Sequence, residues 1–547
     1  MPDTNSPIRT DFDAVVVGAG FSGLYMLHKL RELGLSARVI EMADGVGGTW
    51  FWNRYPGARC DSESYYYCFT FSKEILLEWE WTSRYPEQPE ILRYLNYIAD
   101  KLDLRRDIQF STRVSGARYD DATAKWTIET DRGDRLTASY FITAVGCLSS
   151  AQIPNFKGRE TFRGQSYHTA QWPHEAVDFT ARRVGIIGTG STGIQAIPVI
   201  ARQAAHLTVF QRTPNYTVPA RDRPMPSEFK QDVKARYDEI VQKTRESVFG
   251  MPFDFPERSA LEVAPEERDK VYEDLWNRGG FCFMLSSFHD LITDPEANDT
   301  AAEYVRRKIR EIVQDPETAR KLSPSNHPIG TKRPPIDTDY YETFNRENVT
   351  LIDIRSEPIE EITPEGIRTS KRNYKVDAIV YATGFDAMTG SLFRLNIRGR
   401  GGMLLQEKWA DGPHTYLGIA TTDFPNLFMI TGPGSPSVLS NMPISIEQHV
   451  EWIAACLGHM QGHGLDEIEP LREAEEAWDA HVAETAQATL FPRANSWYMG
   501  ANIPGKPRVF FPYAGGVGAY RQRCTEVADN HYEGFVLRQH RERVASR

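Results

Sequence analysis

Paired cysteines are missing from this sequence. Its 547 residues include six cysteines, and no two of them form a Cys-x-x-Cys pair. They stand at Cys60, Cys68, Cys147, Cys282, Cys456 and Cys524. No His or Cys group has the spacing of zinc ligands, so we expect no metal site. The absence of a redox dithiol excludes the disulfide reductases and predicts reduced thiols in cores or pocket walls.

Long apolar runs and a basic excess are also missing. No stretch approaches the roughly 18–20 apolar residues that span a bilayer, so we expect no membrane association. Residues 1–6 contain neither a basic end nor an apolar segment, which predicts a cytoplasmic protein without a signal peptide. The 63 Lys and Arg against 74 Asp and Glu give a net charge of −11, which argues against nucleic acid as a partner.

Glycine residues are present at a spacing that is typical of nucleotide-binding turns. A first turn of the form Gly-x-Gly-x-x-Gly contains Gly18, Gly20 and Gly23. Its glycines allow a tight turn, close approach to a pyrophosphate and close helix–strand packing, and the following helix N-terminus supplies free N–H groups. A β-branched strand at 13–17 precedes the turn, and a second strand at 37–41 ends in Glu41, where a carboxylate binds ribose hydroxyls. This context, and not the glycines alone, predicts a dinucleotide site.

A second turn of the same form follows in the middle of the chain. It consists of Gly188, Thr189, Gly190, Ser191, Thr192 and Gly193. Strands are expected at 184–187 and 207–211, with a helix at 192–203 between them. Where the first unit has Glu41, this one has Arg212 and Thr213. An acid favours a free ribose 2′-hydroxyl and an arginine favours a 2′-phosphate, so we predict FAD at the first turn and NADPH at the second.

Two loops have a composition suited to a cofactor site. The first runs from Gly48, Thr49 and Trp50 to Asp61 and is rich in glycine and aromatic residues. It could wrap a large flat cofactor, or it could be a turn-rich loop held by aromatic contacts. The second, 330–335, places two cations before a double proline and would be a stiff presenting loop, or otherwise a solvated basic turn.

The remaining segments complete an α/β chain with a helical part. Further strands are expected at 139–144, 349–354, 377–381 and 426–432, and a helix at about 444–457. Residues 222–322 have apolar residues at helical spacing, which predicts a helical insertion with the aromatic run 281–288 in its core. Short peptides at 154–158 and 382–386 would carry the chain from the first nucleotide unit to the second and back.

We therefore predict two discontinuous, doubly wound (Rossmann-like) dinucleotide-binding domains, FAD and NADP, and a helical insertion. The length of the chain, which exceeds one hydrophobic core, agrees with this division. The expected boundaries are 1–150 and 385–547 for the FAD domain, 151–221 and 330–384 for the NADP domain, and 222–329 for the insertion.

The peptide before the second turn resembles a family signature. Phe162-x-Gly164-x3-His168-x3-Trp172-Pro173, between two Gly-x-Gly-x-x-Gly turns, is similar to the fingerprint of the type I Baeyer–Villiger monooxygenases. The peptides from Gly48 to Asp61 and from Asp377 to Gly384 resemble the family's other motifs. The likeness covers Asp13 to Phe535. It is nearest to the phenylacetone and steroid monooxygenases, and somewhat less near to the cyclohexanone monooxygenases, which lack two residues where this chain has Ser437-Val438.

The resemblance implies an activity. NADPH would reduce FAD, the reduced flavin would take up O2, and a flavin C4a-peroxide would attack a ketone carbonyl. The tetrahedral peroxy (Criegee) intermediate would rearrange to an ester or lactone. The implied substrates are cyclic, aryl or bulky ketones, with thioether sulfoxidation as a side activity, and the implied state is a monomer or weak homo-oligomer.

The resemblance also implies roles for particular residues. Arg333 would be the catalytic cation and Asp61 the carboxylate that orients it. His168 and Trp172 would couple domain movement to the site. Implied FAD contacts also include Gly48, Thr49, Trp50, Asp61 and Tyr67, and implied NADP contacts are Arg212, Thr213, Lys332 and Trp497. The expected substrate pocket consists of Ser62, Cys147, Leu148, Ser437, Val438, Leu439 and Met442.

Two alternatives remain open. One is another flavin monooxygenase with two nucleotide sites that oxidises nitrogen or sulfur. N-hydroxylating enzymes are not expected to share the Trp172-Pro173 ending of the fingerprint or the loop that presents Arg333. The other is an NADPH oxidase or a flavin-dependent redox sensor, which would release peroxide without a substrate.

Overall fold

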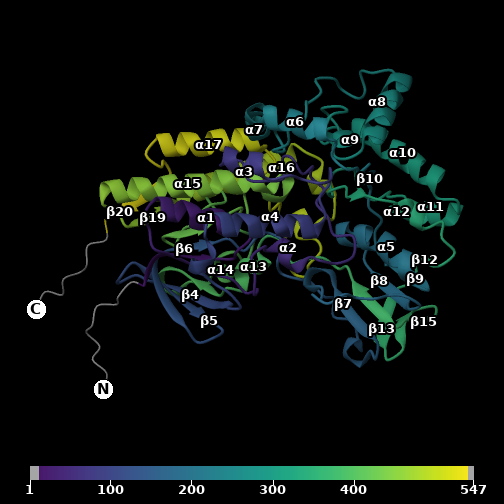
Figure 1. The fold of residues 1–547 in the computed structure, drawn as a ribbon, viewed down its shortest axis with the longest axis horizontal. Helices are drawn as coiled ribbons and strands as arrows, with labels where there is room; N and C mark the ends of the chain where they lie inside the picture. The colour runs from purple at the N-terminus through teal and green to yellow at the C-terminus, as the bar shows by residue number, and fades with distance from the viewer. Residues whose placement is uncertain (1–10, 540–547) are drawn as a thin grey trace, which may run out of the picture.

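The computed structural model describes residues 11–539, which form two main sheets, one mixed and one parallel, with helices around them (Figure 1). The expectation of no signal peptide rests on residues 1–6, which lie outside the described residues. Within 11–539, no helix combines the length and the apolar character that crossing a membrane requires.

The first sheet has eight strands in the order β17-β4-β5-β6-β1-β2-β3, with β18 paired to β6. Their bounds are β1 Phe12–Val17, β2 Ala37–Ile40, β3 Ile108–Gln109, β4 Val114–Asp120, β5 Lys125–Thr130, β6 Arg135–Thr143, β17 Ile397–Arg398 and β18 Leu427–Met429. The β-branched residues at the end of β1 are buried, as expected of a central parallel strand. Since β17 and β18 come from far along the chain, the first domain is discontinuous, as predicted.

The second sheet has five parallel strands in the order β12-β9-β8-β16-β7. Their bounds are β7 Gln165–His168, β8 Arg183–Ile187, β9 His206–Gln211, β12 Val349–Asp353 and β16 Ala378–Tyr381. This sheet also joins distant segments. Together the two sheets confirm the predicted fold class.

The chain passes between the two sheets through a pair of adjacent segments. Ala151 and Phe385 form an isolated antiparallel bridge, and the Gln152 N–H donates to the Gly384 carbonyl at 2.9 Å. The predicted crossing peptide 382–386 therefore lies beside residues 151–152, which come just before the other predicted crossing peptide, 154–158.

The predicted helical insertion is present at the upper right of Figure 1. It contains α6 Ser227–Ala235, α7 Tyr237–Glu246, α8 Pro265–Arg278, α9 Cys282–Leu285, α10 Pro295–Ile312 and α11 Pro316–Leu322. The aromatic run at 281–288 is buried as expected, but only one turn of it is helical. Gly279 and Gly280, both at positive φ, end α8 just before it and prevent a continuous helix.

The remaining helices include one at 21–32 that packs on β1 and β2 and one at 191–203 that packs on β8 and β9. Their bounds are α1 Phe21–Glu32, α2 Thr49–Trp52, α3 Lys73–Glu78, α4 Gln88–Lys101, α5 Ser191–Gln203, α12 Tyr340–Thr343, α13 Gly390–Phe393, α14 Leu405–Lys408, α15 Met442–His463, α16 Arg472–Gln487 and α17 Val517–Asp529. Smaller sheets are formed by β10 Val218–Pro219 with β11 Ile336–Asp337, by β13 Ile359–Thr363, β14 Gly366–Thr369 and β15 Asn373–Lys375, and by β19 Glu467–Pro470 with β20 Phe535–Arg538.

Two predicted elements have different bounds in the structure, and local backbone chemistry explains both. The helix expected at about 444–457 begins at Met442, because Pro443 is favourable in a first turn, and ends at His463 before Gly464 in the left-handed region. The strand expected at 426–432 is only β18, since Asn426 and Thr431 both have positive φ.

Candidate functional site

Arg333 and Asp61 form the centre of the candidate site. The guanidinium donates from Nε to Asp61 Oδ2 and from Nη2 to Asp61 Oδ1, both at 2.8 Å. Its Nη1 donates to the Val438 carbonyl at 3.1 Å, and its carbon atom Cζ lies 4.8 Å from the centre of the Phe281 ring. Three segments that are distant from it in the sequence therefore fix this cation.

Electrostatics keep Arg333 charged in this position. Burial opposes the charge, but the adjacent Asp61 carboxylate outweighs it, so the pKa of Arg333 is raised above its ordinary value. A forked guanidinium held on a carboxylate by two hydrogen bonds has a defined orientation. The arrangement can stabilise negative charge that develops on a bound molecule.

Most of the predicted substrate-pocket residues lie together beside this cation. Cys147 and Val438 are buried in one hydrophobic cluster, against which the partly buried Leu148, Leu439, Met442 and Trp497 pack. Ser437 joins them through its Oγ, 2.9 Å from Cys147 Sγ. Burial raises the pKa of the Cys147 thiol, which keeps it protonated. Ser62 is not in this cluster but is buried next to Asp61.

The first glycine turn has the geometry its sequence predicts. Gly18 has φ +105°, and a Cβ on Gly23 would meet the Gly18 carbonyl oxygen at 1.8 Å. A Cβ on Gly20 would lie 3.3 Å from Gly48 Cα, so two loops cross closely here. The buried Glu41 accepts hydrogen bonds from the N–H groups of Ala19 and Ala43, at 2.6 and 2.7 Å, which places its carboxylate at the turn.

The remaining candidate FAD residues surround this turn. Thr49 is the first residue of α2 and is exposed, while the next residue, Trp50, is buried. The Trp50 indole N–H donates to the Tyr67 hydroxyl at 3.2 Å, and the two rings are 6.0 Å apart.

The second glycine turn differs from the first in one informative respect. Gly188 has φ +109°, and a Cβ on Gly193 would meet the Gly188 carbonyl oxygen at 2.3 Å. A Cβ on Gly190, however, would find no atom of residues 11–539 within 4 Å. The fold itself does not require this glycine, so the open space beside it fits a closely approaching ligand such as a pyrophosphate.

Two cations lie near this turn without carboxylate partners. Within the described part of the chain, the side chains of Arg212 and Lys332 make no hydrogen bond and no ion pair. Burial, and then the charge of Arg212, lower the pKa of Lys332 to about 8. Two neighbouring cations that lack counter-charges fit a phosphate group.

The other predicted NADP contacts line the same turn. Thr189 Oγ1 donates to the Thr213 carbonyl at 3.3 Å, and Ser191 is the exposed first residue of α5. Thr192 Oγ1 lies 3.2 Å from the hydroxyl of Thr169, which belongs to the fingerprint peptide. The turn is thus tied to the segment that precedes it.

The fingerprint peptide connects structural elements. Gly164 passes so close to β16 that a Cβ would meet the Asp377 carbonyl at 2.4 Å, and its neighbour Phe162 packs on the same side. Trp172 is buried and stacks on Tyr167 at 5.1 Å.

His168 lies where the two crossing segments meet. Its Nδ1 accepts from the Ala170 N–H at 3.0 Å, so the ring proton is on Nε2. Nε2 lies 3.3 Å from the Gln152 carbonyl and 3.3 Å from Thr383 Oγ1. Burial lowers the pKa of His168, which keeps it neutral. It remains our prediction that His168 organises this junction and does not act as a base.

Trp497 lies in a loop that is attached to the second crossing segment. The Asn502 amide donates to the Phe385 carbonyl at 2.7 Å. Lys506 donates to Asp386 Oδ1 at 2.7 Å and to the Ala387 carbonyl at 2.6 Å. The position of Trp497 therefore depends on the crossing.

Three residues of the site were not predicted from the sequence. Phe281 was assigned only to a helical core, yet it also contacts Arg333. Tyr498 is buried close enough to affect the pKa of Arg333, and Lys506 holds the loop of Trp497. An isolated lysine or tyrosine in a loop carries no pattern, whereas the double glycine before Phe281 could have indicated a bend into a site.

Acidic and cysteine side chains form no metal site in the described residues. Among residues 11–539, no group of three or more His, Cys, Asp or Glu could hold a metal ion. The six cysteines are unpaired and buried.

Comparison with known proteins places the whole chain among flavin enzymes. The family described as FMO-like, "Flavin-binding monooxygenase-like", matches residues 13–245. A Baeyer-Villiger monooxygenase of Pseudooceanicola batsensis is 46% identical over 545 residues, 99% of this chain and 99% of its own. Phenazine N-monooxygenase PhzNO1 of Lysobacter antibioticus is 47% identical over 533 residues, 97% of each chain.

One solved structure has the same fold as this chain over nearly its full length. An oxidized steroid monooxygenase bound to NADP has a TM-score of 0.93 and 50% identity, and the match covers 97% of this chain and 100% of that one.

Proposed function

The chain belongs to the Baeyer–Villiger monooxygenase family, and on that premise we propose that it inserts one oxygen atom next to the carbonyl of cyclic, aryl or other bulky ketones. It is an NADPH-dependent, FAD-containing oxygenase, and its product would be an ester or a lactone. The proposal for bulky ketones is supported by the likeness to a steroid monooxygenase.

The two cofactors fit different turns. The family binds a flavin, and a glycine turn that accepts a pyrophosphate needs a dinucleotide, so the flavin is FAD. We assign FAD to the first turn, near Glu41, Trp50 and Tyr67. We assign NADPH to the second turn, with its pyrophosphate beside Gly190 and its 2′-phosphate between Arg212 and Lys332.

Arg333 is the observation that carries the proposed mechanism. When bound, the reduced flavin supplies the electrons that activate O2. The guanidinium, fixed by Asp61, the Val438 carbonyl and Phe281, then stabilises the negative charge that develops on oxygen atoms at the ketone carbon. Because the cation is already oriented, no reorganisation is needed during the reaction. Trp497 and the apolar cluster around Val438 would exclude water.

Replacing Arg333 tests this role. In Arg333→Ala, we expect NADPH to reduce the flavin at a normal rate, while ester formation falls by about 10²–10³-fold or more, the effect of losing an electrostatic catalyst. Stopped-flow absorbance measures the first step, and gas chromatography measures the product. Arg372→Ala, which changes an exposed arginine, is the control. Ester formation at the normal rate in Arg333→Ala would disprove the assignment.

Oxidation of an aromatic nitrogen is a second candidate activity. The relative named as a phenazine N-monooxygenase is as similar to this chain as the Baeyer–Villiger relative is, which weakens our expectation that N-oxidising enzymes differ in their motifs. A panel of phenylacetone, cyclohexanone, a steroid ketone, a thioether and phenazine, with product analysis, ranks the candidates. Nitrogen attack creates no charged adduct at a carbonyl carbon, so Arg333→Ala should impair ketone oxidation more than N-oxidation.

We further propose a cytoplasmic monomer or weak homo-oligomer with the domain boundaries predicted above. Light scattering coupled to size-exclusion chromatography measures the mass of the particle. Limited proteolysis tests the boundaries, since cleavage is expected near residue 221, which is exposed, and not inside the sheets or at the buried boundaries near 150, 330 and 385.

A further inference from the structure

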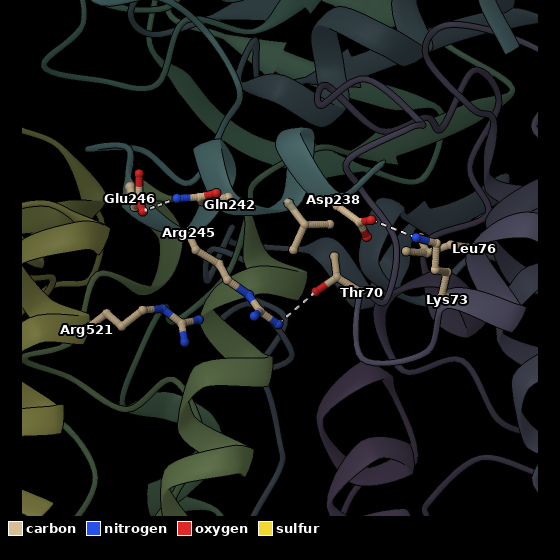
Figure 2. A pocket seen from close by; sticks show the side chains of 9 residues that line it. Thr70, Lys73, Leu76, Asp238, Gln242, Arg245, Glu246 and Arg521 are labelled. Atoms are coloured by element: carbon tan, nitrogen blue, oxygen red, sulfur yellow. Dashed lines mark hydrogen bonds and ion pairs between the residues drawn. The ribbon is translucent and has the colours of Figure 1, made fainter. Parts of the chain in front are cut away.

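The helical insertion meets the first domain at two places of different character. At the first, α3, α7 and α17 line a cavity of about 510 Å³, and the ion pair of Lys73 with Asp238 joins α3 to α7 at 2.7 Å (Figure 2). The two side chains of this pair are 61% and 84% exposed, so the pair contributes little to holding the insertion. The second place is buried and lies beside the candidate site.

The buried contact contains an ion pair between Arg84 and Glu63. Arg84 Nη2 donates to Glu63 Oε1 at 2.8 Å, and the two side chains are only 9% and 7% exposed. Burial opposes the charge of Arg84, but the adjacent carboxylate outweighs it and raises the pKa of Arg84 above its ordinary value. Replacing such a pair by apolar residues is often neutral or stabilising, so stability alone does not explain its presence here.

Arg84 also caps the helix that precedes Phe281. Its Nη1 donates to the Arg278 carbonyl at 2.6 Å, and its Nη2 donates to the Gly279 carbonyl at 3.3 Å. These carbonyls lie at the C-terminal end of α8, where helical carbonyls lack partners within the helix and the dipole is negative. Gly279 and the residue after it have positive φ and turn the chain toward Phe281, whose ring centre lies 4.8 Å from Cζ of Arg333. Arg84 therefore fixes the point from which this ring reaches the cation.

The same arginine fixes the loop that carries Asp61. The carboxylate that Arg84 binds belongs to the second residue after Asp61. The backbone around Arg84 adds two further contacts: the Cys60 N–H donates to the Pro86 carbonyl at 3.0 Å, and the Ser64 N–H donates to the Arg84 carbonyl at 2.8 Å. Asp61 therefore lies between two anchored residues.

We propose that Arg84 is a positioning residue for the oxygen insertion proposed above, on which its role rests. Its guanidinium holds Phe281 through the end of α8 and holds Asp61 through Glu63. Asp61 accepts two hydrogen bonds from Arg333, and Phe281 lies against the same guanidinium, so a shift of either group moves the cation. A displacement of about 1 Å can slow a reaction by about 100-fold, so a small shift is enough.

Replacing the buried pair by apolar residues tests this role. The double variant Arg84→Met with Glu63→Met leaves neither charge buried without its partner, so it should fold. With the ketone that the holoenzyme oxidises fastest, we expect ester formation to fall by about tenfold to 100-fold, while NADPH reduces the flavin within about twofold of the wild-type rate. Lys73→Met with Asp238→Met removes the exposed pair between the same two parts of the molecule. This matched control should leave both rates unchanged.

The Nε–H nuclear magnetic resonance signal of Arg333 provides a measurement that does not depend on turnover. The nearby aromatic ring of Phe281 shifts this signal, and Arg333→Ala identifies it by its loss. We expect the signal to move in the double variant and in Arg84→Lys, because a lysine keeps the charge but lacks the planar fork that reaches three acceptors. The signal should not move in the control variant.

Three results in the double variant would overturn the proposal. They are ester formation at the wild-type rate, an equal fall in flavin reduction, which would indicate a general loss of structure, and an unchanged Arg333 signal. If the double variant fails to fold, Arg84→Lys is judged by the same three results. The proposed function fails by different results, namely no ester from any ketone or normal ester formation in Arg333→Ala. The Arg333 signal then decides by itself whether Arg84 positions this cation.

Discussion

We expect the charge of a single residue, Lys332, to link coenzyme binding to pH. Burial, together with Arg212, lowers its pKa to about 8. Below that pH the protonated amine attracts a 2′-phosphate, and above it the neutral amine does not. We therefore expect the dissociation constant of NADP⁺ to rise above pH 8, by up to about tenfold per pH unit, until the higher pKa of the bound form is passed.

Fluorescence titrations on both sides of pH 8 measure this dependence. NAD⁺, which has no 2′-phosphate, should show no such rise, and Lys332→Met should bind NADP⁺ more weakly with a flat profile. A wild-type dissociation constant that stays level through pH 8 would show that Lys332 does not contact the phosphate.

Asp61 stabilises the fold as well as orienting its partner. Asp61→Asn keeps the shape but leaves the partly buried Arg333 without a counter-charge. We expect the free energy of unfolding to fall by about 1–3 kcal/mol, and ketone oxidation to fall with it. Asp377→Asn breaks a similar but more exposed pair with Arg183 and should cost less than about 1 kcal/mol. Urea unfolding followed by flavin fluorescence compares the two, and equal losses would contradict the argument.

At this scale, the resemblance to family motifs predicted the charged partners but not what lies against them. Arg333 and Asp61 were predicted because family motifs contain both. Phe281 was not, because an aromatic residue in an apolar run gives no sign that a cation will lie on its ring. That contact depends on how the insertion folds back, which is a tertiary property.

At the scale of elements, the turn before α5 contains one glycine, Gly190, that we expect ligand binding to require and the fold not to require. A Cβ at Gly190 meets no described atom, and its φ of −83° suits any residue. We expect Gly190→Ala to change the free energy of unfolding by less than about 0.5 kcal/mol. We also expect NADP⁺ binding to weaken by at least about tenfold, since the methyl group would occupy the space of the pyrophosphate.

Gly193→Ala is the matched control. Its Cβ would meet the Gly188 carbonyl oxygen at 2.3 Å, so this variant should lose stability as well as binding. Thermal unfolding and NADP⁺ titration of both variants distinguish the two cases. Normal NADP⁺ binding by Gly190→Ala would place the pyrophosphate elsewhere.

Strands and helices were predictable where side-chain pattern decides them, and less so where backbone chemistry does. The buried β-branched runs of β1 and β8 are evident in the sequence. The end of β18 is not, because it depends on Thr431 adopting a positive φ, which no pattern of hydrophobicity reveals. The loop of Trp497 is likewise held by isolated contacts from Asn502 and Lys506.

At the scale of the whole molecule, one hydrophobic core spans the predicted domains. Tyr55 and Ala58, from the loop before Asp61, are buried in the same cluster as Trp172 and the apolar face of α5. The Tyr55 hydroxyl also donates to Gln195 Oε1 on α5 at 2.7 Å. The second domain therefore cannot unfold without exposing apolar surface of the first.

We accordingly expect a single thermal transition for the holoenzyme. Flavin release, followed by fluorescence, and loss of tertiary structure, followed by near-ultraviolet circular dichroism, should share one midpoint. A separate earlier transition that leaves the flavin bound would show that the second domain unfolds on its own. The duplicated glycine turns predicted the two domains, but the shared core could not be predicted because it joins residues without a common motif.

The bridge between Ala151 and Phe385 means that the chain enters and leaves the half that we assign to NADP at one point. This half could therefore be exchanged between relatives as one unit, because both points at which the chain must be joined lie at this single pair of residues. A chimera that exchanges it would graft the coenzyme site, the insertion and Arg333 onto an unchanged flavin half. The grafted insertion would also need an α7 whose surface fits α17 of the flavin half, because the contact between these two helices lies outside the junction.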